Sequence, residues 1–364
     1  MRTLEKLTIK GFKSIRDQTL ELDRLNVFIG GNGVGKSNLI GVFRLLHEVI
    51  NQRLTEYVAK RGGADRILHF GRKKTPDLEL EFVINDLFPE DKFRYETILK
   101  STDEGQLFVH DEWITKETNG DELGAILPNS KIESRLKNET DELSKQLFKE
   151  LDSYRVYHFH DTSETAAMKV ACDLEDNRFL RPQAENLAAY LYYLQERQPD
   201  HFSLIEDTIR QVAPFFEGFR LSPSRLNKDK IRIEWREKGS DSYFNASAFS
   251  DGTLRFICLA TLLLQPKESL PSVILLDEPE LGLHPAAIAL LADLLTSASE
   301  QTQILVATQS VTLVNHLLPD QVWTVNREGD QSVFQKLDQT DYSNWLEDYA
   351  LGDLWEKNLI NARP

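Results

Sequence analysis

This sequence has few cysteines, no long apolar run and no excess of basic charge. Only two of the 364 residues are cysteines, Cys172 and Cys258, and their wide separation favours reduced thiols over a disulfide framework. No stretch approaches the roughly eighteen consecutive apolar residues of a spanning helix. The first residues also lack the apolar core of a secretion signal. We therefore expect a cytoplasmic protein without membrane contact.

The charge balance argues against a protein that binds nucleic acid over its whole surface. There are 58 acidic and 43 basic residues, which gives a net charge of −15. Such a field repels phosphate, so nucleic acid remains possible only at a local groove. Basic residues do gather at 71–75 and at 225–238. The second cluster mixes both signs, which favours a solvated surface over a DNA-binding stripe.

The remaining composition is that of a globular protein, with 41% apolar and 28% charged residues. In the first half, period-two alternation and apolar runs predict strands at 2–9, 18–23, 25–30, 78–84, 93–99, 106–110 and 154–160. Helical spacing predicts a helix over 36–54 and a charged, projecting helical arm over 130–151. In the second half, helices are expected at 185–198, 202–219, 253–264 and 285–298, with strands at 230–235, 271–279, 302–308, 321–326 and 331–337.

A phosphate-binding loop stands between the strand at 25–30 and the helix that follows. The segment "GGNGVGKS" contains Gly30, Gly35, Lys36 and Ser37 at the spacing G-x-x-x-x-G-K-[ST] of a Walker A motif. The glycines let backbone N–H groups turn toward a β-phosphate, while the lysine reaches the β- and γ-oxygens. The serine hydroxyl is a ligand for Mg²⁺. This loop predicts binding of a nucleoside triphosphate.

A second motif supplies the carboxylates that such a site needs. The run "VILLDE" is a buried strand that ends in Asp277 and Glu278. We expect Asp277 to hold Mg²⁺ and Glu278 to polarise the attacking water as a general base. No N-K-x-D tetrad is present, which excludes a GTPase. These two motifs alone leave a small-molecule kinase open.

A further small-residue turn, "FSDGTLRF" at 249–256, opens onto a helix and suits a second phosphate contact. Together with "KGFKSI", "FIGGNGVGKSN", "LLDEPELGLHP" and "ATQS", it resembles the RecF/SMC-like ABC-type ATPases. The nearest resemblance is to predicted AAA-family ATPases grouped near the overcoming-lysogenization-defect (OLD) proteins. It covers about residues 1–84 and 245–340, and "VYHFHDTS" at 156–163 is also similar to that subgroup.

The resemblance implies a homodimer in which each signature turn contacts the ATP held by the other chain. The implied nucleotide contacts come from the first turn, the P-loop and the signature, at Lys13, Gly30, Asn32, Gly33, Val34, Gly35, Lys36, Ser37, Asn38, Ser250, Asp251, Gly252 and Thr253. Gln309 stands where the family usually has a switch histidine. Because glutamine cannot become cationic, slow or regulated hydrolysis is expected. No Q-loop glutamine is recognisable at 67–74.

The implied fold is α/β, a P-loop NTPase of the ABC-ATPase type with a β-rich amino-terminal lobe and a helical lobe and arm. We expect five parts: an ATPase lobe at 1–84, inserted strands and arm at 85–170, a helical lobe at 171–248, the signature and Walker B part at 249–340, and a tail at 341–364. His158, His160 and Asp161 suggest a metal site, but structural packing is the favoured interpretation.

Three functions remain at this point. The first is an ATP-switched dimer that controls a separate effector such as a nuclease, in anti-phage defence or DNA surveillance and repair. The segment after 337 is too short for a Toprim nuclease domain, and no Asp-x-Asp pair occurs. The second function is the nucleotide-binding subunit of a membrane transporter, and the third is a metabolite kinase, which would not need residues 249–256. The tail and the arm are the candidate surfaces for an effector.

Overall fold

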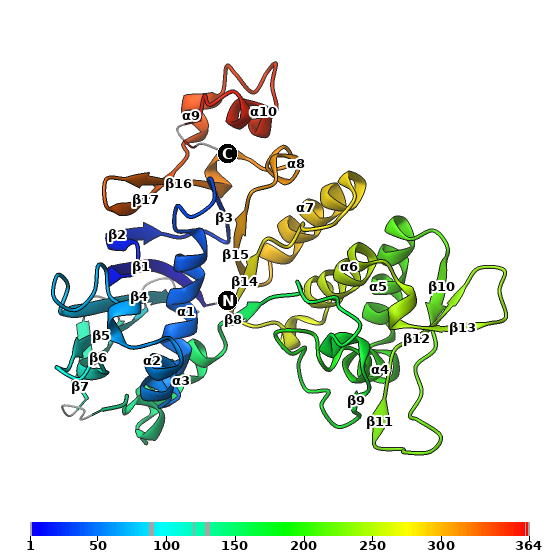
Figure 1. The fold of residues 1–364 in the computed structure, drawn as a ribbon, viewed down its shortest axis with the longest axis horizontal. Coiled ribbons are helices and arrows are strands. Elements are labelled where there is room, and N and C mark those ends of the chain that lie inside the picture. The colour runs from blue at the N-terminus through cyan, green and yellow to red at the C-terminus, as the bar shows by residue number, and fades with distance from the viewer. Residues whose placement is uncertain (1, 87–90, 119–120, 128–131, 361, 363–364) are drawn as a thin grey trace.

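The computed structural model describes residues 2–86, 91–118, 121–127, 132–360 and 362. Its amino-terminal part is an antiparallel sheet with the strand order β2-β1-β4-β5-β6-β7 (Figure 1). The strands are β1 (Thr3–Phe12), β2 (Ile15–Glu21), β4 (Asp77–Asn85), β5 (Lys92–Ser101), β6 (Leu107–Thr118) and β7 (Asp121–Ile126). The predicted meander is therefore present. It is longer than expected, because β6 continues well beyond residue 110.

A second six-stranded sheet carries the motifs and has the order β17-β16-β3-β15-β14-β8. Its strands are β3 (Leu25–Ile29), β8 (Arg155–Tyr157), β14 (Val273–Asp277), β15 (Gln303–Thr308), β16 (Val322–Glu328) and β17 (Gln331–Lys336). All pairs are parallel except that of β16 with β17. Parallel strands end at one edge, so the segments after β3, β14 and β15 come together there.

Burial on both faces explains why the central strands β3, β14 and β15 are largely apolar. In β14, Val273 and Leu275 belong to a core shared with helix α1 (Lys36–Ile50) and the antiparallel sheet. Ile274 and Leu276 point into a second core with the carboxy-terminal helices. Helix α1 therefore lies between the two sheets, and the helical lobe covers the other face.

The helices divide between these two cores, and Figure 1 shows the two groups on opposite sides of β14 and β15. Helices α1, α2 (Leu54–Lys60) and α3 (Glu142–Asp152) lie with the antiparallel sheet. The second core contains α4 (Leu187–Arg197), α5 (Pro199–Val212), α6 (Asp251–Leu263), α7 (Pro285–Ser299), α8 (Val311–Val314) and α10 (Leu351–Glu356), and α9 (Gln339–Tyr342) follows the last strand.

Short elements complete the helical lobe and the connections. Three strands pair as β10 (Phe216–Phe219), β12 (Glu234–Glu237) and β13 (Tyr243–Asn245), while β9 (Cys172–Asp173) pairs with β11 (Lys230–Ile231). Single 3-10 turns occur at Ala64–Arg66, Leu136–Asn138, Ala167–Lys169, Ala246–Ala248, Lys267–Ser269 and Pro319–Gln321.

The charged helix expected over 130–151 is confirmed from Glu142 onward, but its earlier start and its projection as an arm are wrong. Residues 128–131 lie outside the described residues, and the helix begins only at Glu142, where Asp141 accepts a hydrogen bond from the backbone N–H of Ser144. Leu147 and Leu151 are buried in the core that contains α1. A helix with one apolar stripe packs on its own domain when such a core is within reach, so α3 does not project.

Two other predicted helices are shorter than expected. The one over 36–54 ends at Ile50, and Gln52 takes a positive φ of 60° before α2 begins. The one over 202–219 ends at Val212, because Pro214 disfavours the helical conformation of Ala213. The chain then forms β10, so Phe216 and Phe219 lie in a strand.

The predicted five-part division stays a prediction, although its first boundary separates the paired strands β4 and β5. In the tail, Leu351, Leu354 and Trp355 are buried against the rest of the domain, while Trp345 and Tyr349 remain 48% and 38% exposed. Among the described residues, no helix is long and apolar enough to cross a membrane.

Candidate functional site

The P-loop conformation depends on glycine at two positions. Gly30 and Gly35 have φ values of 151° and 123°, a region that residues with a Cβ rarely adopt. A Cβ on Gly30 would stand 2.3 Å from the carbonyl oxygen of Val325, and one on Gly35 would stand 2.1 Å from Oγ of Ser332. The loop between β3 and α1 is therefore packed against strands β16 and β17 and is held in one shape.

Lys36 points back into this loop. Its Nζ donates hydrogen bonds to the carbonyl oxygens of Gly30 and of Gly31, the latter at 2.9 Å. Only 6% of the residue is exposed, and this burial lowers the pKa of the ammonium group, against the opposing charges of Glu278 and Asp277. Because no carboxylate forms an ion pair with Lys36 in the described part of the chain, its charge is available to an anion.

Two serines that the sequence analysis did not select hold the loop from the outside. Oγ of Ser332 donates to the carbonyl oxygen of Val34 and lies 2.6 Å from Oγ of Ser14. Ser14 in turn accepts a hydrogen bond of 2.7 Å from Nδ2 of Asn38. The turn "KGFKSI" thus contacts the P-loop directly. The position of Ser14 in that motif was the only sequence signal for this contact.

Lys13 occupies the same turn, with a φ of 46° and its Nζ 5.3 Å from the ring centre of Phe12. Burial lowers the pKa of Lys13, and the charges of Arg61 and Arg44 lower it further. Its carbonyl oxygen lies 2.6 Å from Nδ1 of His69, in the segment where no Q-loop glutamine was found. A role of Lys13 in nucleotide binding remains a prediction.

The two acids of "VILLDE" lie where β14 ends. Asp277 is the last strand residue, and burial together with the neighbouring charge of Glu278 raises the pKa of its carboxyl group. Glu278 has a φ of 45°, which is rare for a residue other than glycine, and its N–H donates to the carbonyl oxygen of Ala307 at 2.8 Å. Nε2 of Gln309, which follows β15, donates to Oε1 of Glu278. The structure therefore brings Gln309 to the general-base candidate.

Glu280 is a functional candidate that the sequence reasoning missed, although it stands inside "DEPE". Its Oε1 accepts a hydrogen bond from Oγ1 of Thr308, whereas Oε2 is buried without a partner in the described structure. Burial raises the pKa of Glu280. Oγ1 of Thr308 also accepts from the N–H of Ser310 at 2.9 Å. This chain of contacts connects the turn after β14 to the turn after β15.

The signature turn caps helix α6. Oγ of Ser250 accepts a hydrogen bond from the N–H of Thr253 at 3.2 Å, and both Ser250 and Asp251 are exposed. Oδ1 of Asp251 lies 3.8 Å from Nζ of Lys169. No hydrogen bond or ion pair between described residues joins Ser250–Thr253 to the P-loop of the same chain.

Gly252 is constrained by its own chain. A Cβ on this residue would lie 2.4 Å from the carbonyl oxygen of Gly282, in the turn "ELGLH" after the Walker B strand. Arg255, one turn further along α6, donates to the carbonyl oxygens of Leu281 and His160 at 2.8 and 2.9 Å. The signature helix is therefore fixed to the segment that follows Glu278. Sequence spacing gave no sign of this arginine.

The segment "YHFHD" lies beside the Walker B strand. Nε2 of His160 is 2.8 Å from the carbonyl oxygen of Asp277, and the rings of His158 and His160 have centres 4.0 Å apart. Burial lowers the pKa of His158, and His160 adds to this effect. Within the described ranges, no group of three or more histidine, cysteine, aspartate and glutamate residues could hold a metal ion.

Comparison with known proteins places these features in a family. A family model described as an AAA domain, putative AbiEii toxin of a type IV toxin–antitoxin (TA) system, matches residues 25–315. This range includes the P-loop, the signature, the Walker B strand and Gln309. A search of curated proteins found no match.

Solved structures of similar fold are heads of Smc proteins. The Smc head bound to the C-winged helix domain of ScpA has a TM-score of 0.64 and 17% identity, over 93% of this chain and 99% of that chain. A Smc head domain with an extended coiled coil, bound to the C-terminal domain of ScpA from Pyrococcus furiosus, has a TM-score of 0.61 and 16% identity, over 96% and 99%. A Smc head domain with a coiled coil and joint from Pyrococcus yayanosii has a TM-score of 0.57 and 16% identity, over 96% of this chain and 99% of that chain. These likenesses show that the fold is that of a P-loop NTPase of the ABC type.

Proposed function

The chain belongs to the family of AAA domains described as putative AbiEii toxins of type IV toxin–antitoxin systems, and from this premise we propose that it is an ATP-driven switch that controls a separate effector. As a member of this family, the chain is a P-loop ATPase. The finer proposal is that two copies close on ATP and that hydrolysis releases or activates the effector, in anti-phage defence or in DNA surveillance and repair. The observation that carries it is an exposed signature turn that, among the described residues, forms no hydrogen bond or ion pair with the P-loop of its own chain.

The residues of the P-loop fit a triphosphate with Mg²⁺. Among the described residues, the buried ammonium group of Lys36 is hydrogen-bonded only to carbonyl oxygens, which an incoming phosphate oxygen can replace at lower electrostatic cost. Ser37, at the first turn of α1, and Asp277, at the end of β14, would hold Mg²⁺. The metal ion supplies charge neutralisation at the phosphates. The orphaned Oε2 of the nearby Glu280 is a further acceptor for water.

Glu278 and Gln309 are suited to position the attacking water. The backbone of Glu278 is anchored to Ala307, and its carboxylate already accepts a hydrogen bond from Gln309. In this arrangement Glu278 accepts the proton of water, while the amide of Gln309 orients the carboxylate. An amide stays neutral at every pH, so Gln309 cannot supply the charge that a protonated histidine would supply. We therefore expect slow turnover that an effector or trigger can regulate.

The signature would complete the site of a second copy. Ser250 offers a hydroxyl, and the first turn of α6 offers the positive end of the helix dipole. Because Arg255 fixes α6 to the segment after Glu278, closure of the dimer would also act on the general base of the same chain. This coupling is the two-state element that we propose γ-phosphate biases.

Two linked experiments test the proposal. Glu278→Gln should bind ATP without hydrolysing it, so that ATP converts the monomer to a stable dimer in size-exclusion chromatography with light scattering. Mixing Lys36→Ala with Ser250→Arg chains should restore part of the hydrolysis that each variant lacks, because one of the two composite sites is then intact. An inactive mixture in which heterodimers demonstrably form would sink the proposal that the signature acts on the partner chain.

A further inference from the structure

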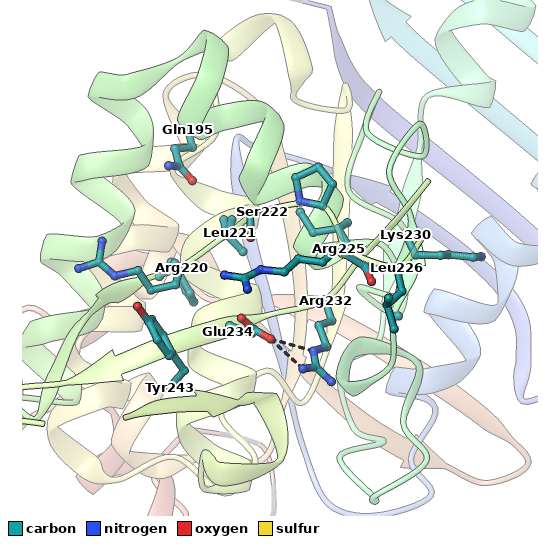
Figure 2. A pocket seen from close by; sticks show the side chains of 15 residues that line it. Gln195, Arg220, Leu221, Ser222, Arg225, Leu226, Lys230, Arg232, Glu234 and Tyr243 are labelled. Carbon is teal, nitrogen blue, oxygen red and sulfur yellow. Dashed lines mark hydrogen bonds and ion pairs between the residues drawn. The ribbon is translucent and has the colours of Figure 1, made fainter. Parts of the chain in front are cut away.

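A cleft in the helical lobe lies outside all of the motifs described above. It has a volume of about 940 Å³ and is bordered by the loop at 220–226 and by strands β11, β12 and β13. Figure 2 shows four basic side chains among the residues that line it: Arg220, Arg225, Lys230 and Arg232. The one acidic residue of the lining is Glu234. In a chain with a net charge of −15, this local excess of positive charge calls for a ligand of opposite sign.

Two of the four cations are already paired, and two are not. Arg232 donates two hydrogen bonds to Oε1 of Glu234, at 3.0 and 2.8 Å, and Nζ of Lys230 lies 2.7 Å from Oδ1 of Asp173. Arg220 and Arg225 are exposed and have no ion-pair partner among the described residues. The unpaired charge of the cleft is therefore on these two arginines.

The backbone holds the two arginines at separate points along the cleft. The N–H of Arg220 donates to the carbonyl oxygen of Glu234 at 2.7 Å, which holds the backbone of Arg220 against strand β12. The N–H of Ser224 donates to the carbonyl oxygen of Lys230 at 2.8 Å, which closes the turn that carries Arg225. In Figure 2, the charged ends of Arg220 and Arg225 start from separate positions and both point to the left of the view, whereas that of Lys230 points to the right. Separated cations suit a chain with repeated negative charges better than a single phosphate.

Other lining groups suit the sugar and base of a nucleotide. Tyr243 borders the cleft with 63% of its surface exposed, and one face of its ring lies 5.7 Å from the guanidinium carbon of Arg236. Such an exposed ring is a platform on which a base can stack. Ser222 and Ser224 add hydroxyl groups, and the buried Oε1 of Gln195 lacks a hydrogen-bond partner in the described structure. An acidic peptide would use the arginines but would leave the aromatic face without a partner.

We propose that this cleft binds a short single-stranded nucleic acid, with Arg220 and Arg225 on successive phosphates and Tyr243 against a base. The site is separate from the ATP site, and its ligand is a candidate trigger for the switch. Two to four neutralised phosphates give a slope of about −1.4 to −2.8 in a plot of log affinity against log salt for a single strand. The negative charge of the remaining surface keeps binding outside the cleft weak.

The experiment measures fluorescence anisotropy of a labelled dT12 or U12 oligonucleotide with the full chain in low salt. Arg220→Glu/Arg225→Glu should weaken binding by at least tenfold and should reduce the salt slope by about 1.4. Tyr243→Ala should weaken binding by about fivefold or more with an unchanged slope, because stacking carries no charge. Lys145→Glu/Lys149→Glu, which reverses two exposed charges on α3, is the matched control and should bind as the parent chain does.

Each alternative ligand has its own arm in the experiment. Equal affinity for a 12-base-pair duplex, displacement by polyglutamate at matched charge, or saturation by AMP alone would overturn the proposal in favour of a duplex, an acidic polypeptide or a mononucleotide. Absence of binding, or binding that the paired arginine reversal does not change, would also overturn it. ATP hydrolysis and melting temperature are measured for every variant. Failure of this proposal therefore leaves the ATPase proposal standing, and the reverse also holds.

Discussion

The ammonium group of Lys36 is the main positive charge that the P-loop offers to a phosphate. It is buried, its pKa is lowered by that burial, and its hydrogen bonds go only to loop carbonyls. A bound polyphosphate would stabilise the charged form, so affinity for ATP and protonation of Lys36 support each other. The same residue therefore contributes more to ligand binding than to the stability of the fold.

We accordingly expect Lys36→Ala to weaken ATP binding by at least 100-fold, or about 2.7 kcal/mol, in isothermal titration calorimetry. The melting temperature of the protein without nucleotide should change little, because the lost side chain forms no ion pair in the described structure. An ATP affinity equal to that of the parent chain would contradict the assignment of the loop.

Glu280 offers a test of the electrostatics at the same edge of the sheet. Burial raises its pKa above the ordinary value of 4.5, so the folded chain binds this proton more tightly than the unfolded chain does. The ionised carboxylate therefore destabilises the fold above the folded-state pKa, and this cost disappears as the pH falls to 4.5 and below. Gln in its place retains an acceptor for the hydroxyl of Thr308.

Glu280→Gln should therefore raise the free energy of unfolding at pH 8, by about 1.4 kcal/mol for each unit by which the pKa is raised. The gain should shrink as the pH is lowered and should vanish near pH 4.5 and below, in urea denaturation at a series of pH values. Glu347→Gln, at an exposed position in the tail, is the control and should show no gain at any pH. A loss of stability at pH 8 would mean that ionised Glu280 has a partner through which it stabilises the fold, and would contradict this prediction.

Helix α6 links the signature to the turn after the Walker B strand. Gly252 lies against the carbonyl oxygen of Gly282, and Arg255 bonds to the carbonyl oxygens of Leu281 and His160. Because the neighbouring atom is backbone, a side chain at 252 cannot be accommodated by a rotamer change. The glycine of the signature therefore fixes the position of the helix as well as leaving room for a ligand.

Gly252→Ala should displace the start of α6, because the added carbon would lie only 2.4 Å from the oxygen of Gly282. We expect hydrolysis to fall by at least tenfold, with ATP binding by the separate P-loop retained, in parallel turnover and calorimetry measurements. Gly41→Ala in α1 is a control for thermal stability, since its added carbon would lie 3.4 Å from the ring of Phe12 and 3.8 Å from Nζ of Lys13, without a closer contact to backbone. Hydrolysis at the parent rate in Gly252→Ala would show that the packing against Gly282 is adjustable.

The motifs of the ATP site and the candidate surfaces for an effector lie in different parts of the molecule. The motifs gather at one edge of the parallel sheet, whereas the basic cleft belongs to the helical lobe and α10 packs on α8 at the carboxy-terminal side (Figure 1). The exposed Trp345 and Tyr349 lie on the tail before α10 and remain candidates for an effector surface. Helix α3, which packs on α1, is no longer such a candidate.

The purified 364-residue chain should therefore hydrolyse ATP but leave DNA and RNA uncut in the presence of Mg²⁺ or Mn²⁺. The reason is that the proposed function assigns the effector activity to a separate polypeptide. Gel assays with single-stranded and double-stranded substrates check this. Cleavage that disappears in Glu278→Gln would show that the effector is part of this chain, and the proposal of a separate effector would be abandoned.

The sequence by itself determined the parts of the site that depend on local chemistry. A strand, a glycine loop and a helix in order specify the P-loop, and four apolar residues followed by Asp277 and Glu278 specify a buried strand with acids at its end. The alternation of strands and helices in the last third of the chain also predicted the α/β class. These features depend on periodicity and on steric rules that act over a few residues.

Only the tertiary structure decided which distant residues meet. Ser332 is 318 positions from Ser14 and contacts it beside the P-loop. Arg255 donates hydrogen bonds both to the loop after β8 and to the turn after β14. The sequence also could not show that α3 packs its apolar residues against α1 and therefore does not project from the domain. Side-chain contacts of this kind depend on how sheets and helices are stacked. That stacking depends on the sum of many apolar contacts, so it cannot be inferred from any single segment of the sequence.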